Sequence, residues 1–254
     1  MTTSTMSPIL RKILKICVPI AVYIVLWQLL SILVGSSLLL PSPKETLLAV
    51  IRIISTPAGW RSIGISVLRI LCGFLLGCLI GVVLAVLTSS SKTLSWLLHP
   101  LRTIVKTTPI TSFALILLIS IVSGYVPVAV AAIVVTPMIW RTTEESILGL
   151  DPKLAEMGKV YLTPFKQFRY IVLPQIVPQF FATASTALGF AWKAVITAEI
   201  LALPKFGIGN QMFQDKLYLD YADLFAWTLL VILFSVLIEL LLNRLLQKAG
   251  WKHD

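Results

Sequence analysis

Charged residues are scarce in this chain. Asp, Glu, Lys and Arg make up 13% of its 254 residues, and 57% of the residues are apolar. An average soluble domain has roughly 25% charged residues. The mean hydropathy is +0.94. Because long apolar runs are stable in a bilayer, the composition excludes an ordinary soluble domain and predicts an integral membrane protein.

Residues for catalysis and metal binding are also few. The three cysteines, Cys17, Cys72 and Cys78, lie in apolar stretches and form no CxxC motif, and the two histidines, His99 and His253, are far apart in the sequence. This pattern excludes a disulfide framework and a Cys/His metal site. The chain also contains no GxxxxGK[ST] phosphate-binding loop. We therefore expect no enzymatic activity, no metal and no cofactor in this chain.

The formal net charge of +10 does not indicate a nucleic-acid-binding protein. Such proteins gather Lys and Arg on one face of a solvated domain, whereas here the basic residues lie between apolar runs. Their distribution is typical of membrane topology signals, so we expect no nucleic-acid partner.

Six apolar runs predict six transmembrane helices, since a span needs about 20 residues. The basic start of the chain precedes an apolar run that is long enough to span, which favours an uncleaved first helix over a signal peptide. The third and fourth runs are interrupted around Gly124 and Pro127, so one kinked helix is an alternative to two short ones. The expected spans are 16–34, 62–88, 109–123, 126–140, 172–200 and 224–246.

The distribution of basic residues favours the six-span alternative. With the N-terminus inside, six spans place 14 basic residues in cytoplasmic segments and 5 outside, whereas merging the third and fourth spans gives 8 inside and 11 outside. Basic residues in short loops stay cytoplasmic. We therefore expect a single transmembrane domain over 16–247, with cytoplasmic ends at 1–15 and 248–254. The outer loop at 41–60 has apolar residues at helical spacing, which suits either a surface amphipathic helix or an ordinary connecting helix.

The cytoplasmic segment 141–171 has the pattern of two short helices. Asp151-Pro152 is a typical helix start, and apolar residues then recur at helical spacing until Leu162-Thr163-Pro164 interrupts them. A second short helix follows from Phe165. Two short helices with an apolar face are suited to a groove on a cytoplasmic partner. The alternative is a loop that only covers the end of the helix bundle.

This segment resembles the EAA loop of the permeases of binding-protein-dependent ABC importers. The motif's end matches Ile171-Val172-Leu173-Pro174; its glycine position falls on Tyr161, and its EAA triplet on Ala155-Glu156-Met157. Further stretches resemble the subgroup that imports nitrate, sulfonates, taurine and thiamine precursors, so that the resemblance covers about 38–247. These stretches are Leu40-Pro41-Ser42-Pro43, the helix containing Arg69, Ala191-Trp192-Lys193, Ala198-Glu199 and Gly207-Ile208-Gly209.

The resemblance implies an all-α type I importer permease with a cytoplasmic coupling helix in a prokaryotic plasma membrane. Its implied partners are ABC ATPase subunits that use ATP and Mg²⁺, an extracytoplasmic solute-binding protein, a second permease copy in a homodimer, and membrane lipid. The implied cargo is a small polar solute. The expected ATPase-docking face consists of Leu154, Glu156, Met157, Tyr161, Leu162, Thr163, Phe165 and Phe168.

Polar residues on the fifth span are candidates for the translocation path. A charge at the bilayer centre costs about 2.5–3.5 kcal/mol on insertion scales, so it faces a wet cavity or a partner inside the bundle. Lys193 would attract an anion on the path; the alternative is that Lys193 and Glu199 pair with polar groups or extend to the interface. The candidate path residues are Ser185, Thr186, Gly189, Trp192, Lys193, Thr197 and Glu199.

Other charged and small residues within the spans are interpreted as structural. Arg69 and Glu239 are expected to have structural roles. Gly73, Gly77 and Gly81 repeat at a spacing of four residues on the second span, which predicts close helix packing within the chain rather than a dimer contact.

A transporter or channel without an ATPase is the alternative function. Secondary transporters often contain repeats with broken helices at matching positions. The break between Ser123 and Pro127 has no counterpart elsewhere in the sequence, which favours the importer.

Overall fold

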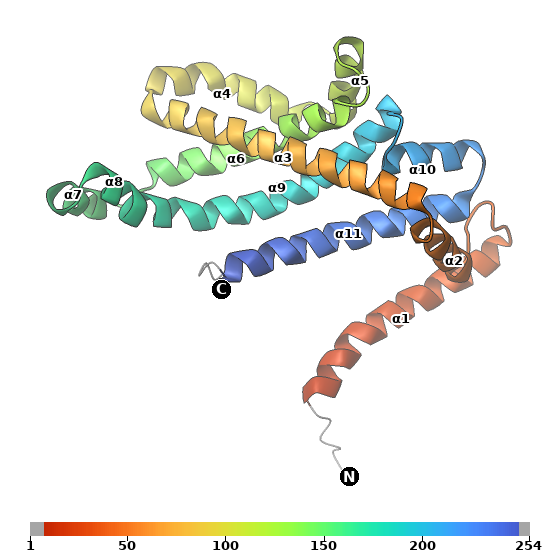
Figure 1. The fold of residues 1–254 in the computed structure, drawn as a ribbon. Coiled ribbons are helices and arrows are strands. Elements are labelled where there is room, and N and C mark those ends of the chain that lie inside the picture. Colours follow the sequence, from red (N-terminus) through yellow and green to blue (C-terminus); the bar gives the residue numbers. More distant parts are fainter. Residues whose placement is uncertain (1–7, 249–254) are drawn as a thin grey trace, which may run out of the picture. The chain divides into compact units, whose positions relative to one another are not determined.

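The computed structural model describes residues 8–248, and for residues 8–14, 16, 242, 243 and 245–248 it describes the backbone alone. Figure 1 shows the helices in chain order. They are α1 (Pro8–Val34), α2 (Pro43–Ile54), α3 (Pro57–Ser90), α4 (Lys92–Thr107), α5 (Ile110–Ser120), α6 (Val126–Leu148), α7 (Pro152–Tyr161), α8 (Pro164–Gln167), the π-helical turn η1 (Phe168–Val172), α9 (Leu173–Ala202), α10 (Ile208–Leu217) and α11 (Tyr221–Lys248). The predicted all-α class is confirmed for this part of the chain. Of the expected ends 1–15 and 248–254, residues 1–7 and 249–254 lie outside the described residues.

Within residues 8–248, five helices are long and apolar enough to cross a membrane, and a sixth crossing requires that α4 and α5 count together. The helix within the expected span 109–123 is α5, which has only 11 residues. At 1.5 Å per residue it rises about 16 Å, roughly half of the hydrocarbon core. The α4–α5 pair bends by 102° at Thr108-Pro109, because proline lacks an N–H and disfavours helical backbone at the residue before it. A third crossing at this place would therefore consist of a broken helix pair and not of one straight helix.

The chain divides into two compact units, of which the first contains Met1–Trp60 and Gln214–Leu230. In this unit the turn after α1 is fixed by two hydrogen bonds: the Trp27 indole N–H donates to the Pro41 carbonyl at 3.0 Å, and the Ser31 hydroxyl donates to the Leu40 carbonyl at 3.0 Å. The expected helix within 41–60 is α2, which begins with a capping box between Ser42 and Glu45. One face of α2 is buried, and the other is exposed and apolar.

Acidic side chains gather beside α2 in the same unit. The Asp223 carboxylate forms an ion pair with the Arg52 guanidinium, with an N–O distance of 2.6 Å. Burial, together with the negative charges of Asp223 and Asp220, raises the pKa of Asp215 to about 7, although Arg52 and a hydrogen bond from Trp227 oppose the shift. The buried Asp215 Oδ2 has no hydrogen-bond partner among residues 8–248, which agrees with a carboxyl group whose charged form is disfavoured.

We predict that the Asp215 carboxyl makes the protein less stable as the pH rises. The unfolded carboxyl ionises near its ordinary pKa of 3.8, whereas the folded one holds its proton up to a pKa of about 7. The free energy of unfolding therefore falls progressively between these two pH values, and this loss of stability is complete above the upper one. Asp215→Asn should flatten this part of the profile and raise stability at pH 8. Thermal unfolding in detergent between pH 4 and 8 tests this; an unchanged slope would contradict it.

The second unit contains Arg61–Phe213 and Val231–Asp254. Here the glycine repeat of α3 lies directly against α6. A Cβ atom at Gly77 would stand 2.7 Å from the Val135 Cβ and 2.9 Å from the Ala132 carbonyl oxygen, and Gly73 and Gly81 are equally confined. Small residues four apart let the two backbones approach this closely. The prediction that this repeat packs within the chain is confirmed.

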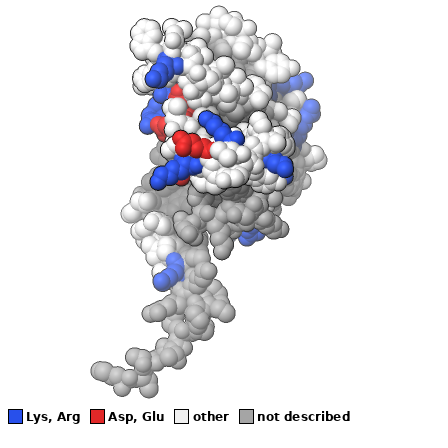
Figure 2. All heavy atoms as spheres, turned by 90° about the vertical axis from the view of Figure 1, so that its left-hand side faces the viewer, with Lys and Arg blue, Asp and Glu red and all other residues white. Residues whose placement is uncertain are grey.

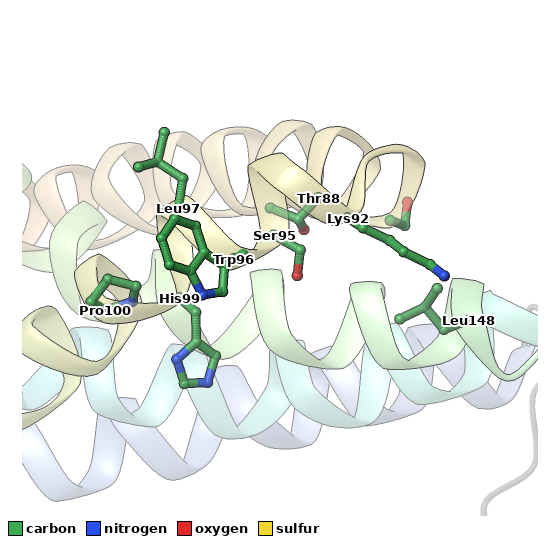
Figure 3. A pocket seen from close by; sticks show the side chains of 9 residues that line it. Thr88, Lys92, Ser95, Trp96, Leu97, His99, Pro100 and Leu148 are labelled. Atoms are coloured by element: carbon green, nitrogen blue, oxygen red, sulfur yellow. The ribbon is translucent and has the colours of Figure 1, made fainter.

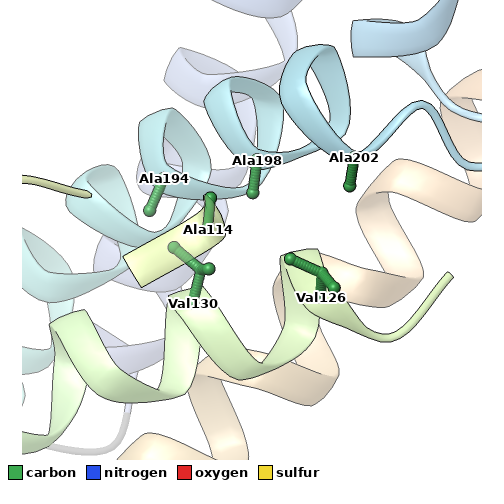
Figure 4. Close-up of a cluster of buried hydrophobic side chains, with 6 residues drawn as sticks. All are labelled: Ala114, Val126, Val130, Ala194, Ala198 and Ala202. Atoms are coloured by element: carbon green, nitrogen blue, oxygen red, sulfur yellow. The ribbon is translucent and has the colours of Figure 1, made fainter. Parts of the chain in front are cut away.

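Helices α6 and α9 form the centre of this unit. Small and β-branched side chains interdigitate between them, and Ala114 of α5 packs against the same cluster (Figure 4). The buried members are Ala114, Val126, Val130, Ala194, Ala198 and Ala202. One face of α9 is fixed by this contact, so the composition of its remaining exposed face bears on function.

Candidate functional site

The segment from α7 to η1 folds as two short helices in contact. Asp151 caps α7 by accepting the Lys153 N–H at 2.8 Å, and α7 ends where Leu162 and Thr163 are extended before α8. Gly158 is buried, and a Cβ atom there would meet Ile171 at 2.6 Å. The Gln167 amide also donates to the Ala155 carbonyl at 3.0 Å. These contacts hold the two helices at a fixed angle.

The outer face of this segment is apolar and exposed. Tyr161 is 80% exposed and Phe165 71%. Leu154, Glu156, Met157, Thr163 and Phe168 are also exposed, and Leu162 is half-buried. The structure thus brings the predicted docking residues together. It adds Val160 and Tyr170, two exposed apolar side chains that the expected set omits.

Basic side chains are also exposed on this segment. Lys153, Lys159, Lys166 and Arg169 are all exposed. Figure 2 views the molecule from this end, where blue side chains lie around a smaller number of acidic ones. An apolar centre with a charged rim is the usual anatomy of a protein–protein interface.

The exposed face of α9 combines polar side chains with one positive charge. Thr186 and Lys193 are exposed, Ser185, Gly189 and Thr197 are half-buried, and a Cβ atom at Gly189 would meet nothing within 4 Å. Thr186, Gly189, Lys193 and Thr197 recur at helical spacing and share one side of the helix. The Lys193 ammonium lies 5.7 Å from the ring centroid of Phe190.

The other two candidate path residues do not belong to this exposed face. Trp192 is 2% exposed and Glu199 is fully buried. Both side chains point into the unit, so neither meets a solute that passes along the exposed side of α9. The Trp192 indole N–H has no hydrogen-bond partner among the described residues.

Glu199 is the centre of a buried polar network with Arg69. The Arg69 guanidinium donates to the Glu199 carboxylate at 2.7 Å and to the Phe206 carbonyl at 2.6 Å, and its Nε donates to the Gly124 carbonyl at 3.2 Å. The Ser66 hydroxyl lies within 2.9 Å of both carboxylate oxygens. The network joins α3, α9, the turn before α6 and the start of α10. It confirms the structural interpretation of Arg69.

A second buried ion pair connects α4 to α6. Arg102 contacts the Glu144 carboxylate at 2.5 Å, and the Trp140 indole of the same helix donates to the Thr88 hydroxyl at 2.9 Å. Nearby, a hollow of about 700 Å³ is lined in part by Lys92, Trp96 and His99 (Figure 3). Within residues 8–248 no three His, Cys, Asp or Glu side chains form a group suited to a metal ion.

Comparison with known proteins identifies the family. A sequence profile described as "Binding-protein-dependent transport system inner membrane component" matches residues 73–249. The chain belongs to this family. The permease is 26% identical over 245 residues to the putative aliphatic sulfonates transport permease protein SsuC of Bacillus subtilis, which covers 92% of this chain and 86% of that protein. It is 27% identical over 246 residues to the nitrate import permease protein NrtB of Synechocystis sp., with the same two coverages of 92% and 86%.

Solved structures support the same assignment at the level of the fold. An inward-facing structure of the MetNI methionine ABC transporter matches with a TM-score of 0.61 and 17% identity, over 80% of the permease and 96% of that chain. The protein is thus a permease subunit of an ABC importer, with several apolar membrane helices. The expected fold class and family are confirmed.

The residues around Glu199 differ in how clearly the sequence indicates their place in the network. Ser66 is one of many small polar residues in an apolar run, and nothing there indicates a partner 133 residues away. Gly207 and Gly209 give a stronger signal. A Cβ atom at either would stand within 2.7 Å of the Glu199 side chain, and Gly207 has a φ of +148°, which favours glycine.

Proposed function

We propose that two copies of the permease form the path of an importer for a small anionic solute in a prokaryotic plasma membrane. An extracytoplasmic binding protein delivers the solute, and ABC ATPase subunits dock on α7, α8 and η1. The observation that carries the proposal is the exposed aromatic face of this docking segment. A face that includes Tyr161, Phe165 and Phe168 requires an apolar partner surface, and the segment continues directly into α9.

The exposed face of α9 is our candidate for the lining of the path. Most exposed side chains in the long apolar stretches of α3 and α11 are aliphatic, as with Leu75 and Leu79 on α3 and Val236 and Leu237 on α11. The α9 face instead carries Thr186, Lys193 and Thr197. Lys193 is nine residues, or about 13 Å, from the end of α9, so its charge lies well within the span. Because a charge facing lipid is costly, Lys193 is expected to face water or the second copy.

Lys193 also supports the choice of an anion as the solute. A single positive charge in a narrow path lowers the energy of an anion and raises that of a cation. The named cargoes of the two relatives, aliphatic sulfonates and nitrate, are anions. Glu199 does not oppose this effect directly, since Arg69 accompanies it in the core.

We predict that a cysteine at Thr197 reacts faster with an anionic thiol reagent than with a cationic one, and that Lys193 causes the difference. The experiment uses a permease with Cys17, Cys72 and Cys78 replaced by serine, in complex with its ATPase. Residues four apart on a helix lie about 5–6 Å from each other, where one charge contributes somewhat under 1 kcal/mol in water. Lys193→Gln should therefore lower the anion-to-cation rate ratio about tenfold, and Lys193→Arg should preserve it.

The reagents are 2-sulfonatoethyl and 2-(trimethylammonio)ethyl methanethiosulfonate, and Leu237→Cys on the apolar face of α11 serves as the unreactive control. If Thr197→Cys reacts with neither reagent, α9 does not line an aqueous path. If it reacts and Lys193→Gln leaves the ratio unchanged, the preference for anions is wrong and the path remains.

A further inference from the structure

The docking segment and the network around Glu199 lie on one continuous helix. Pro164–Ala202 is unbroken over 39 residues, with the π-helical turn η1 between α8 and α9. At 1.5 Å per residue this helix is about 58 Å long. Phe165 and Phe168 stand at one end of it and Glu199 at the other, so a displacement of the docking segment reaches Glu199 along a rigid element.

The Glu199 carboxylate also binds the start of α10. Helix α9 ends at Ala202, and the next residue, Leu203, has a left-handed φ of 46°, which ends the helix before α10. The Gly209 N–H donates to Glu199 Oε2 at 2.9 Å, and the Ile208 N–H donates to the Ser66 hydroxyl at 2.8 Å. The first N–H groups of a helix have no partner within the helix, so these bonds replace an ordinary cap. Glu199 and Ser66 together anchor α10.

Arg69 connects Glu199 to two further segments of the chain. It is bonded to Glu199, to the loop before α10 through Phe206, and to the turn before α6 through Gly124. Its side chain is 13% exposed, and that of Glu199 is 0% exposed. Hydrogen bonds to charged groups in a low dielectric are strong, so relative movement of these elements requires several of them to break together.

We propose that Arg69 and Glu199 are positioning residues that join the start of α10 to α9 as one rigid body, so that movement of the docking segment is transmitted to the start of α10. This proposal rests on the proposed function for the docking segment. It goes beyond that function in assigning the buried pair a mechanical role at the far end of α9. Conformational change then occurs between rigid bodies, and not between α9 and the start of α10.

A double substitution distinguishes the transmission of movement to the start of α10 from the contribution of the ion pair to the stability of the permease. Removing one partner of a buried ion pair leaves an uncompensated charge, whereas replacing both with apolar residues is often neutral. Arg69→Met and Glu199→Leu alone should each lower the unfolding temperature. The combined variant R69M/E199L should recover it and should bind the ATPase pair as the wild type does. It lacks the acceptor for the Gly209 N–H, so that only the Ile208–Ser66 bond still holds the start of α10 and the join to α9 is weakened.

Spin labels at two sites report on transmission in the complex with the ATPase pair. One series carries Phe190→Cys on α9 and the other Lys205→Cys in the loop before α10; each gives one distance between the two copies. In the wild type both distances should change between the nucleotide-free and ATP–vanadate states. In R69M/E199L the Phe190 distance should still change, and the Lys205 distance should broaden and lose its response.

The matched control is R102M/E144L, which removes the other buried ion pair and should leave both responses intact. A Lys205 response in R69M/E199L equal to that of the wild type would overturn the proposal. Loss of both responses together in that variant would also overturn it, because the pair would then have only a general structural role. If neither label responds in the wild type although the ATPase pair is bound, the proposed function itself is at fault.

Discussion

Tyr161→Asp should abolish stable binding of the ABC ATPase to the permease. Tyr161 is 80% exposed at the end of α7, one helical turn after the exposed Met157. Aromatic residues at the centre of an interface commonly contribute about 2 kcal/mol or more, and a carboxylate at this place adds the cost of burying a charge. Together these effects predict a loss of affinity of at least about 100-fold. Adding Glu156→Lys, which reverses a neighbouring charge, should weaken binding further.

The permease should still insert and fold, because the Tyr161 side chain is largely exposed and lies on the open side of α7. Tyr218→Asp is the matched control, since Tyr218 is also 80% exposed but belongs to the turn after α10. Co-purification of tagged permease with its ATPase measures the effect. ATPase recovered in equal amounts with Tyr161→Asp and with Tyr218→Asp would rule out the docking face.

Gly77→Ala should destabilise the permease by about 1–3 kcal/mol, the usual cost of overpacking. The new Cβ would stand 2.7 Å from the Val135 Cβ and 2.9 Å from the Ala132 carbonyl oxygen. A backbone oxygen cannot move aside as a side chain does, so α3 and α6 must separate. The separation also weakens the contact of Thr136 with the Gly77 carbonyl.

Gly64→Ala on the same helix is the control for Gly77→Ala. No atom lies within 4 Å of a Cβ built at Gly64, so alanine should be neutral or stabilise the helix by up to about 1 kcal/mol through its higher propensity. Unfolding of both variants in mixed detergent micelles gives the two free-energy changes. Equal changes for the two variants would show that α3 does not depend on close approach at Gly77.

Local patterns in the sequence predicted much of the fold. The apolar runs indicated most of the long helices because burial in lipid needs about 20 apolar residues whatever the tertiary structure. The glycine repeat indicated close packing, and Asp151-Pro152 and Leu162-Thr163-Pro164 indicated the ends of the two short docking helices. Each of these signals depends on residues within a few positions of each other.

Long-range contacts were beyond the reach of such patterns. The bend between α4 and α5 leaves only 11 helical residues in the expected span 109–123, although this apolar run is continuous in composition. Two of the partners of Glu199, Ser66 and Arg69, lie at sequence separations of 133 and 130 residues. The helical spacing of Lys193 and Glu199 only shows that they do not pair with each other. The two residues differ in burial: Lys193 lies on the exposed face of α9, and Glu199 lies in the core.

Native mass spectrometry of the permease co-expressed with its ABC ATPase tests whether the ATPase docks on α7, α8 and η1. We expect one complex with two permease chains and two ATPase chains, which disappears when the permease carries Tyr161→Asp and persists when it carries Tyr218→Asp. A permease that is purified folded and free of ATPase in every case would rule out this assembly.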